Sequence, residues 1–239
     1  MAVLKVLNVH KSYHEKVLDG ITMELRRGEA LGIVGPNGCG KTTLLRIMAG
    51  LEFPDSGEVI REARRIAIVF QDNRLLPWKT LYQNIALGLK YMKLPASEIR
   101  ARVIRYAREL NLSEEELSLY PGKASGGMRK KAAIARSLAL EPDVLLLDEP
   151  FTGLDVKTID SLKGFLREVV KEVSTVIVSH QLEDLLTLTE RTYLLTHRPA
   201  RIAYELNLSG KSLRERVNLV KEALLHLIEE VGQDSNSYE

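Results

Sequence analysis

The sequence is poor in the features that mark secreted, membrane-spanning or nucleic-acid-binding proteins. It has one cysteine in 239 residues, so no disulfide can form within the chain and a reducing compartment is expected. No apolar run approaches the roughly 18 residues of a membrane-spanning helix, and the N-terminus lacks the apolar stretch of a signal peptide. The 34 basic and 32 acidic residues nearly cancel, which gives no reason to expect a nucleic-acid partner. We therefore expect a soluble cytoplasmic protein.

The remaining pattern alternates between strands and helices and predicts an α/β core. The continuously apolar runs "DVLLLDE" and "STVIVSH" are typical of buried parallel strands, and "LKVLNVHKSY" alternates as a half-buried strand does. Residues 73–140 are mainly helical in pattern, which indicates an insertion. We expect a single domain over 1–239, with 1–72 and 141–208 as its core and 73–140 as a helical subdomain.

Residues 209–239 are expected to form a C-terminal helix and a tail. The helix should run from about Ser212 to Val231, because apolar residues recur there at steps of three and four. These residues are Leu213, Val217, Val220, Leu224, Leu227 and Val231. We expect this face to dock on the chain's own core, with a contact to another subunit as the alternative. The end of the chain, "GQDSNSYE", is expected to be disordered.

The segment "GIVGPNGCGKTT" carries the strongest single indication of function. It matches the pattern G-x-x-x-x-G-K-[ST] and lies between a predicted strand and a predicted helix. Glycines let the backbone point its N–H groups at phosphate oxygens, Lys41 would reach the β- and γ-phosphates, and Thr42 would hold Mg²⁺ through its hydroxyl. The residues expected to bind nucleotide in this loop are Gly35, Asn37, Gly38, Cys39, Gly40, Lys41, Thr42 and Thr43.

Cys39 lies inside this loop, where a small filling side chain is the simplest interpretation and a redox role the alternative. A helix N-terminus can lower the pKa of a thiol. We therefore expect a thiol-alkylating reagent to block nucleotide binding, and MgATP to protect the site.

A second polar cluster is predicted where neighbouring strands end. Asp148 and Glu149 follow "VLLL" and His180 follows "TVIVS", and ligand sites of open α/β sheets lie beyond the carboxyl ends of strands. Asp148 fits a carboxylate that positions Mg²⁺, and Glu149 fits a base for the attacking water. Gln71, after "AIVF", is placed to touch Mg²⁺ or that water. A lone histidine after a strand is usually structural, but this strand is expected to lie beside the Asp148 strand, which would aim His180 at the same place.

The stretch "KASGGMRKKAAIARSLAL" combines a good helix with a poor first turn. Ser125, Gly126 and Gly127 open it, although glycine costs about 1 kcal/mol relative to alanine inside a helix. Free backbone N–H groups at a helix start form an anion site, so we interpret this turn as a phosphate contact. The basic residues that follow are expected to stay in solvent. They are Arg129, Lys130, Lys131 and Arg136.

From Leu4 to about His197, these motifs and their order resemble the nucleotide-binding subunits of ABC transporters. "GPNGCGKTT" looks like the Walker A motif, "VFQD" like the Q-loop and "ASGGM" like the signature. "LLLDEP" looks like Walker B, "TGLD" like the D-loop and "VSHQLED" like the H-loop. The resemblance implies a phosphate-loop NTPase core of ABC type, with an inserted helical subdomain and an antiparallel β subdomain.

The same resemblance implies roles for single residues. It makes Glu149 the catalytic base, with His180, Gln71 and Lys41 acting beside it. It places Tyr13 against adenine, and it makes Asp155 of the D-loop part of the nucleotide site. The implied cofactors are ATP and Mg²⁺. The implied metal ligands are Thr42, Gln71 and Asp148.

The resemblance also implies partners. Two chains would pair head to tail as a homodimer, with ATP between the phosphate loop of one and the signature of the other. Integral-membrane permease subunits would dock on this pair, and a solute-binding protein would act through them, so the chain would be peripheral on the inner face of the cell membrane. The apolar segment 75–78 (Leu75, Leu76, Pro77 and Trp78) is expected either to form the permease contact or to pack inside the helical subdomain.

The signature departs from the family's usual LSGGQ at Ala124 and Met128, and we expect activity to survive because Ser125, Gly126 and Gly127 remain. The finer resemblance, carried by "FQDNRLLPW" and by "YPGKASGGMRKKAAIARSLALEPDVLLLDEPFTGLD", is to bacterial importers of the nitrate, taurine and aliphatic-sulfonate type. It implies a small anion, a sulfonate or a thiamine precursor as cargo. The alternative function is a non-transport ABC ATPase that acts as a scaffold partner, as in iron–sulfur cluster assembly.

Overall fold

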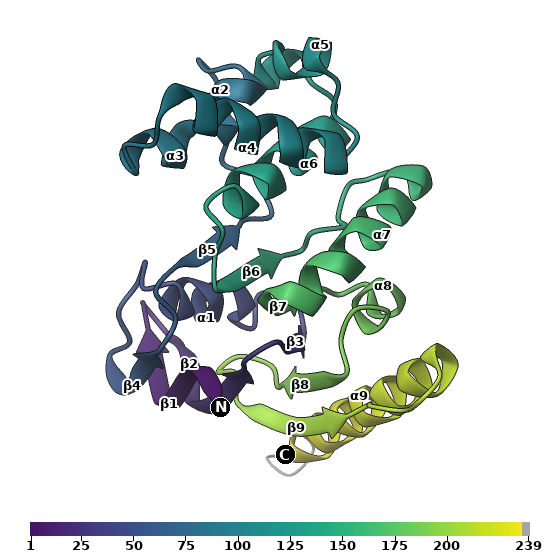
Figure 1. Ribbon diagram of the computed structural model, residues 1–239. Coiled ribbons are helices and arrows are strands. Elements are labelled where there is room, and N and C mark those ends of the chain that lie inside the picture. Colours follow the sequence, from purple (N-terminus) through teal and green to yellow (C-terminus); the bar gives the residue numbers. More distant parts are fainter. Residues whose placement is uncertain (236–239) are drawn as a thin grey trace.

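Two β-sheets form the frame of the structure, a computed structural model that describes residues 1–235, with side chains as far as residue 227 (Figure 1). The smaller sheet is antiparallel in the order β2-β1-β4. Its strands are β1 (Ala2–Ser12), β2 (Lys16–Arg26) and β4 (Ser56–Arg61). The larger sheet has the order β5-β6-β7-β3-β8-β9 and is parallel except for β9 at its edge. Its strands are β3 (Ala30–Val34), β5 (Ile66–Val69), β6 (Val144–Asp148), β7 (Ser174–Val178), β8 (Arg191–Leu195) and β9 (Ile202–Asn207).

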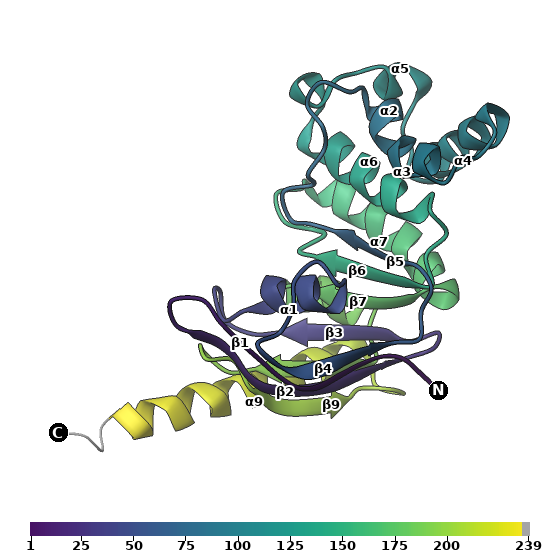
Figure 2. The same ribbon diagram turned by 90° about the vertical axis from the view of Figure 1, so that its left-hand side faces the viewer.

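The helices fall into three groups along the chain. Helix α1 (Lys41–Met48) lies between the two sheets, and a group of short helices gathers at one end of the molecule (Figure 2). This group consists of α2 (Leu81–Ile85), α3 (Leu87–Tyr91), α4 (Ala96–Glu109), α5 (Glu114–Leu117), the 3₁₀ turn η1 (Pro121–Lys123) and α6 (Gly126–Leu138). The later helices are α7 (Val156–Glu172), α8 (Leu182–Leu186) and α9 (Leu213–Ser235).

Strand β6 shows why the central strands read as continuous apolar runs. Its side chains alternate between two buried cores, because both faces of the sheet are covered. Leu145 and Leu147 pack with the helices α2, α4, α6 and α7, whereas Val144 and Leu146 pack with α1 and the smaller sheet. Burial of each such aliphatic side chain stabilises the folded state by about 1.5–3 kcal/mol. The carboxyl end of this strand is therefore held firmly from both sides.

The turn at Arg27 and Gly28 does more than join two successive strands. It carries the chain from β2 in the smaller sheet to β3 in the larger one. Gly28 adopts a φ of +71°, which a residue without a side chain adopts at little cost. The turn thus fixes β3, and the loop that follows β3, at the junction of the two sheets.

Helix α9 docks on its own chain, as expected. Val217, Val220 and Leu227 are buried against β8, β9 and α8. Leu213 is 42% exposed, so the predicted apolar face begins one turn later than expected. The helix continues to Ser235, so the expectation of disorder is wrong for 232–235; the side chain of Val231 and residues 236–239 lie outside the described part of the chain.

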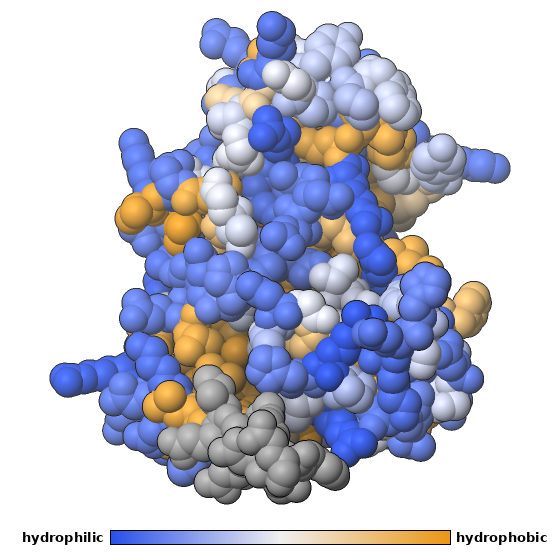
Figure 3. Space-filling model, turned by 180° about the vertical axis from the view of Figure 1, so that it is seen from behind, coloured by the Kyte–Doolittle hydropathy of each residue, from blue (hydrophilic) through white to orange (hydrophobic). Residues whose placement is uncertain are grey.

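The outer surface is mostly polar. Seen from behind, hydrophilic side chains separate several apolar patches (Figure 3). Within residues 1–235 we find no helix with the length and apolarity that a membrane crossing requires.

Candidate nucleotide-binding site

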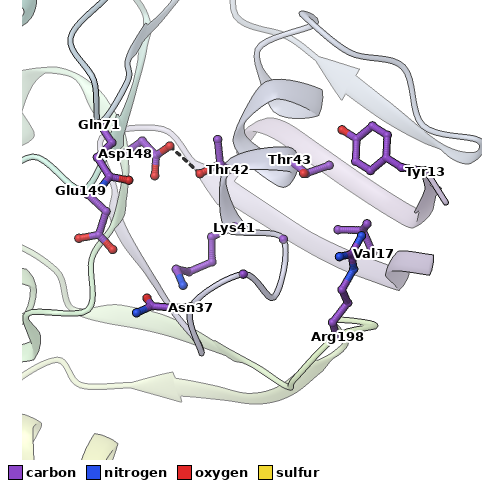
Figure 4. A pocket seen from close by; sticks show the side chains of 12 residues that line it. Tyr13, Val17, Asn37, Lys41, Thr42, Thr43, Gln71, Asp148, Glu149 and Arg198 are labelled. Atoms are coloured by element: carbon purple, nitrogen blue, oxygen red, sulfur yellow. Dashed lines mark hydrogen bonds between the residues drawn. The ribbon is translucent and has the colours of Figure 1, made fainter. Parts of the chain in front are cut away.

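A pocket of about 280 Å³ opens at the N-terminus of α1, opposite the ends of β5 and β6 (Figure 4). Twelve residues line it: Tyr13, Val17, Asn37, Gly38, Gly40, Lys41, Thr42, Thr43, Gln71, Asp148, Glu149 and Arg198. Ten of the twelve belong to the predicted site. Val17 and Arg198 do not, and no local pattern joins them, because only the pairing of distant segments brings residues 17 and 198 together.

The loop between β3 and α1 needs glycine at two positions. Gly38 has a φ of +76° and Gly40 a φ of +125°. A Cβ atom on Gly40 would lie 2.8 Å from Cγ1 of Val17, closer than real Cβ contacts come. The loop therefore packs tightly on β2, and Gly38 and Gly40 line the pocket. Glycine-rich backbone in this position is suited to an anion cradle, in which backbone N–H groups bind phosphate oxygens.

Lys41 is held across this loop by backbone oxygens. Its Nζ donates to the carbonyl of Gly35 at 2.8 Å and to that of Pro36 at 2.7 Å, and its side chain is nearly buried. The ammonium is thus positioned over the cradle before any ligand arrives. A phosphate oxygen in the cradle would find this cation without a change of fold.

Thr42 and Asp148 bring two oxygen atoms together from opposite walls of the pocket. The Thr42 hydroxyl donates to Oδ2 of Asp148 at 2.8 Å (Figure 4). Burial raises the pKa of Asp148 and the Thr42 hydrogen bond opposes that change. Hydroxyl, carboxylate and, from Gln71, amide oxygens are hard donors, and Mg²⁺ takes few protein ligands beside substrate phosphates. The residues present therefore fit a magnesium ion.

Glu149 directly follows β6, with its side chain at the pocket wall and a φ of +48°. Its Oε2 lies 2.9 Å from Nδ1 of His180 and accepts from the Thr152 hydroxyl at 3.1 Å. The two predicted strand-end residues therefore meet, as the parallel pairing of β6 with β7 requires. His180 is not among the twelve lining residues; it reaches the pocket through Glu149.

Lys130 contradicts its predicted exposure. It is only 2% exposed, and its Nζ donates to the carbonyl of Gln71 at 3.0 Å and lies 3.5 Å from that of Glu149. Burial lowers its pKa to about 8, partly offset by the carboxylates of Asp148, Asp72 and Glu149. The expectation was wrong because it followed the charge of the side chain. By its position in the helical period, Lys130 lies on the buried face of α6.

Cys39 also differs from expectation. Its side chain is 1% exposed and packs in the core below the loop, so only its backbone can face a nucleotide. Burial raises the pKa of the thiol, which overrides the predicted lowering at a helix N-terminus. The interpretation as a small filling side chain is the one that the structure supports.

The glycine-rich start of α6 lies away from the pocket of its own chain. Ser125, Gly126 and Gly127 are not among the twelve lining residues; a Cβ on Gly126 would have the carbonyl of Gly153 as its neighbour at 3.7 Å. Ser125 caps the helix: its hydroxyl accepts from the N–H of Met128, and the Met128 sulfur accepts from the N–H of Ser125 at 3.3 Å. The methionine thus completes a capping box in which glutamine or glutamate is usual.

Asp155 lies near that turn rather than in the pocket. Its side chain caps α7, where it accepts from the N–H of Thr158 at 3.0 Å and from its hydroxyl at 2.7 Å. These hydrogen bonds lower the pKa of Asp155. Within one chain, a nucleotide contact is therefore not available to it.

Tyr13 stands at the end of the pocket farthest from Asp148 and Glu149 (Figure 4). The residue is 53% exposed, and its hydroxyl donates to Glu52. The ammonium of Lys11 lies 5.6 Å from the ring centroid. An aromatic face held at a pocket mouth is suited to a nucleotide base.

Comparison with known proteins agrees with this geometry. A family model described as ABC transporter matches residues 18–152. An uncharacterized ABC transporter ATP-binding protein of Methanocaldococcus jannaschii is 36% identical over 230 residues, which are 90% of this chain and 86% of that protein. An aliphatic sulfonates import ATP-binding protein of Paraburkholderia xenovorans is 42% identical over 189 residues, 78% of this chain and 73% of that protein.

Solved structures show the same similarity. A dimeric ATP-binding cassette in a post-hydrolysis state, bound to ADP and Pi, superposes with a TM-score of 0.80 and 28% identity. The match covers 87% of this chain and 99% of that one.

Proposed function

We propose that this chain, which belongs to the ABC transporter family, is the ATP-hydrolysing subunit of an importer. The chain is an ATPase that uses ATP with Mg²⁺. The import role is supported by relatives such as the sulfonate protein of Paraburkholderia xenovorans. We propose a single domain, with 73–140 as its helical subdomain.

The pocket supports a division of labour among its residues. The loop N–H groups and Lys41 bind the phosphates, while Thr42, Gln71 and Asp148 supply the oxygen donors for Mg²⁺. The bound ion would neutralise charge on the β- and γ-phosphates. Tyr13 stacks on the adenine at the other end.

Glu149 is positioned to accept a proton from the attacking water. Its carboxylate is nearly buried at the pocket wall, and His180 and Thr152 fix the Oε2 atom. The second oxygen of this carboxylate has no hydrogen bond to a described residue, so it is the one that can face water. His180 acts as a positioning residue for Glu149.

The location of Ser125, Gly126 and Gly127 carries the proposal that two chains work together. This turn is built as an anion site, yet its own chain's pocket does not include it. A two-fold homodimer would place it on the partner's nucleotide and would give two identical sites. Asp155, near the same turn, would then act at that interface rather than in its own pocket.

Mixed dimers test this arrangement. Lys41→Ala removes the phosphate cation and Ser125→Arg blocks the helix start, so each parent alone should be inactive. In a heterodimer one site combines both changes and the other combines neither, so one working site returns. Equal mixing leaves half of the dimers mixed, and ATPase activity should reach about a quarter of wild type on this statistical count. A mixture as inactive as its parents would refute sharing of the site.

The segment 75–78 supports the permease contact. Trp78 is 69% exposed, whereas Leu75 packs against the helical core, so the segment is anchored at one end and free at the other. An integral-membrane permease docks there, which puts the chain on the inner face of the cell membrane. A solute-binding protein delivers the cargo, a small anion, a sulfonate or a thiamine precursor.

Copurification tests this role. Two integral-membrane proteins should copurify with the chain, whereas copurification with soluble cluster-assembly proteins would instead favour the scaffold function.

A further inference from the structure

Arg198 is a pocket residue with no assigned role. It comes from the hairpin between β8 and β9, and its side chain runs along Val17 towards the pocket (Figure 4). Arg198 and Tyr13 occupy the same end of the pocket, and Asp148 and Glu149 occupy the other. If the triphosphate lies on the loop and Lys41, the end with Arg198 is where the nucleoside lies.

The hairpin that carries Arg198 is fixed to β2 by backbone hydrogen bonds. The N–H of Ala200 donates to the carbonyl of Val17 at 2.8 Å, and the N–H of Asp19 donates to the carbonyl of Ala200 at 2.9 Å. Arg201 donates through Nε to Asp19 at 2.7 Å, and the cations around Asp19 lower the pKa of its carboxyl to about 2. Arg198 is therefore presented from a braced segment rather than from a loose loop.

The guanidinium of Arg198 is left free for a ligand. It is exposed, and across residues 1–235 it makes no hydrogen bond or ion pair with a described residue, in contrast to Arg201. A guanidinium is planar and weakly hydrated, so it stacks on aromatic faces as well as pairing with anions. No carboxylate lines this end of the pocket to claim it.

Tyr13 leaves room for such a second contact. One face of its ring carries the Lys11 ammonium, so a base can stack only on the other face. A base held by Tyr13 alone would expose its far side to water at the mouth of the pocket. The hairpin brings a planar cation to that end of the pocket.

We propose that Arg198 is a second nucleoside contact, whose guanidinium plane packs on the face of the base that Tyr13 leaves free. This inference rests on the proposed nucleotide site. Stacking on a base depends on its π-face rather than on its hydrogen-bonding edge, so the contact would serve adenine and guanine alike. It would strengthen binding of the nucleoside without touching the phosphates.

Two ligands and two variants test this contact. ADP carries the base and pyrophosphate does not, and neither is turned over; ADP binding is measured by titration calorimetry and pyrophosphate binding by competition against ADP. Arg198→Lys keeps the charge but loses the plane, and Arg198→Met loses both. We expect both variants to bind ADP, and likewise GDP, about three- to tenfold more weakly than wild type, with unchanged pyrophosphate binding.

Controls separate this contact from charge, folding and the site itself. Arg64→Met removes an exposed guanidinium far from the pocket and should leave ADP binding unchanged, and thermal denaturation checks that each variant is folded. Wild-type ADP affinity in Arg198→Lys would overturn the proposal, as would an equal loss of pyrophosphate binding, because both point to a phosphate contact. Unchanged ADP binding in Arg198→Met would also overturn it. If the wild type fails to bind ADP, or if Lys41→Ala binds ADP as tightly as the wild type, the proposed nucleotide site itself is refuted.

Discussion

Replacing Lys130 by methionine should make the protein more stable at neutral pH. Methionine is unbranched and one atom shorter than lysine, so it fills most of the same space, and it removes a charge that is buried beside two carbonyl groups. In the unfolded chain a lysine holds its proton up to about pH 10.5, whereas the folded protein gives up the Lys130 proton near pH 8. The difference between these two pKa values corresponds to ~3 kcal/mol of destabilisation by the charged form.

Two effects set the net result at pH 7. The substitution removes that ~3 kcal/mol and loses hydrogen bonds to the carbonyls of Gln71 and Glu149, which we set at ~1 kcal/mol together. The free energy of unfolding should therefore rise by ~2 kcal/mol, or the midpoint of thermal unfolding by roughly 4–8 °C. Between pH 8 and 10.5 the unfolded chain binds more protons than the folded one, so the wild type gains stability and the advantage of the variant shrinks.

Thermal denaturation at pH 7 and pH 10 measures both quantities. The advantage of Lys130→Met should be largest at pH 7 and close to zero at pH 10. Lys131→Met, which removes the neighbouring and less buried lysine of α6, should change the midpoint little at either pH. A lower midpoint for Lys130→Met at pH 7, or a difference that does not vary with pH, would refute the reasoning.

Four further results are expected. Lys41→Ala should abolish tight ATP binding in calorimetry, because its ammonium is fixed over the phosphate cradle. Glu149→Gln should retain ATP without hydrolysis and elute as a dimer from gel filtration in MgATP; a monomer there would count against the two-chain site. Cys39 should react with a thiol-alkylating reagent far more slowly in the folded protein than in urea, since its thiol is buried and its pKa is raised. Gly40→Ala should lower the free energy of unfolding by about 2 kcal/mol in a urea titration, because of its φ and the contact of a new Cβ with Val17.

The parts of the site that were predictable are those that local sequence determines. The phosphate loop is a contiguous pattern, and its glycines stand where the backbone adopts angles that few other residues tolerate. Asp148 and Glu149 follow a buried strand, so their place at the edge of a parallel sheet follows from topology alone. The same reasoning placed His180, because β6 and β7 are neighbours.

The parts that were missed depend on direction or distance. Lys130 precedes Ala133 and Ile134 by three and four residues, so the helical period already placed it on the buried face, although its charge argued for solvent. The direction of the Cys39 side chain has no period to follow, because the residue lies in an irregular loop. Arg198 reaches the pocket only because the hairpin between β8 and β9 pairs with β2.

The N-terminal part of helix α6 connects two sites. Lys130 binds the carbonyl of Gln71, at the nucleotide pocket of its own chain, while Ser125 opens the turn that would serve the partner's nucleotide. Lys130 lies five positions after Ser125, a rise of about 7.5 Å, and so short a length of helix does not bend appreciably. In the proposed dimer, the α6 helix of each chain would connect the nucleotide site of its own chain rigidly to that of its partner. Movement of Gln71 at one nucleotide would then change the contact at the other nucleotide. Hydrolysis at the two sites would therefore be coupled rather than independent.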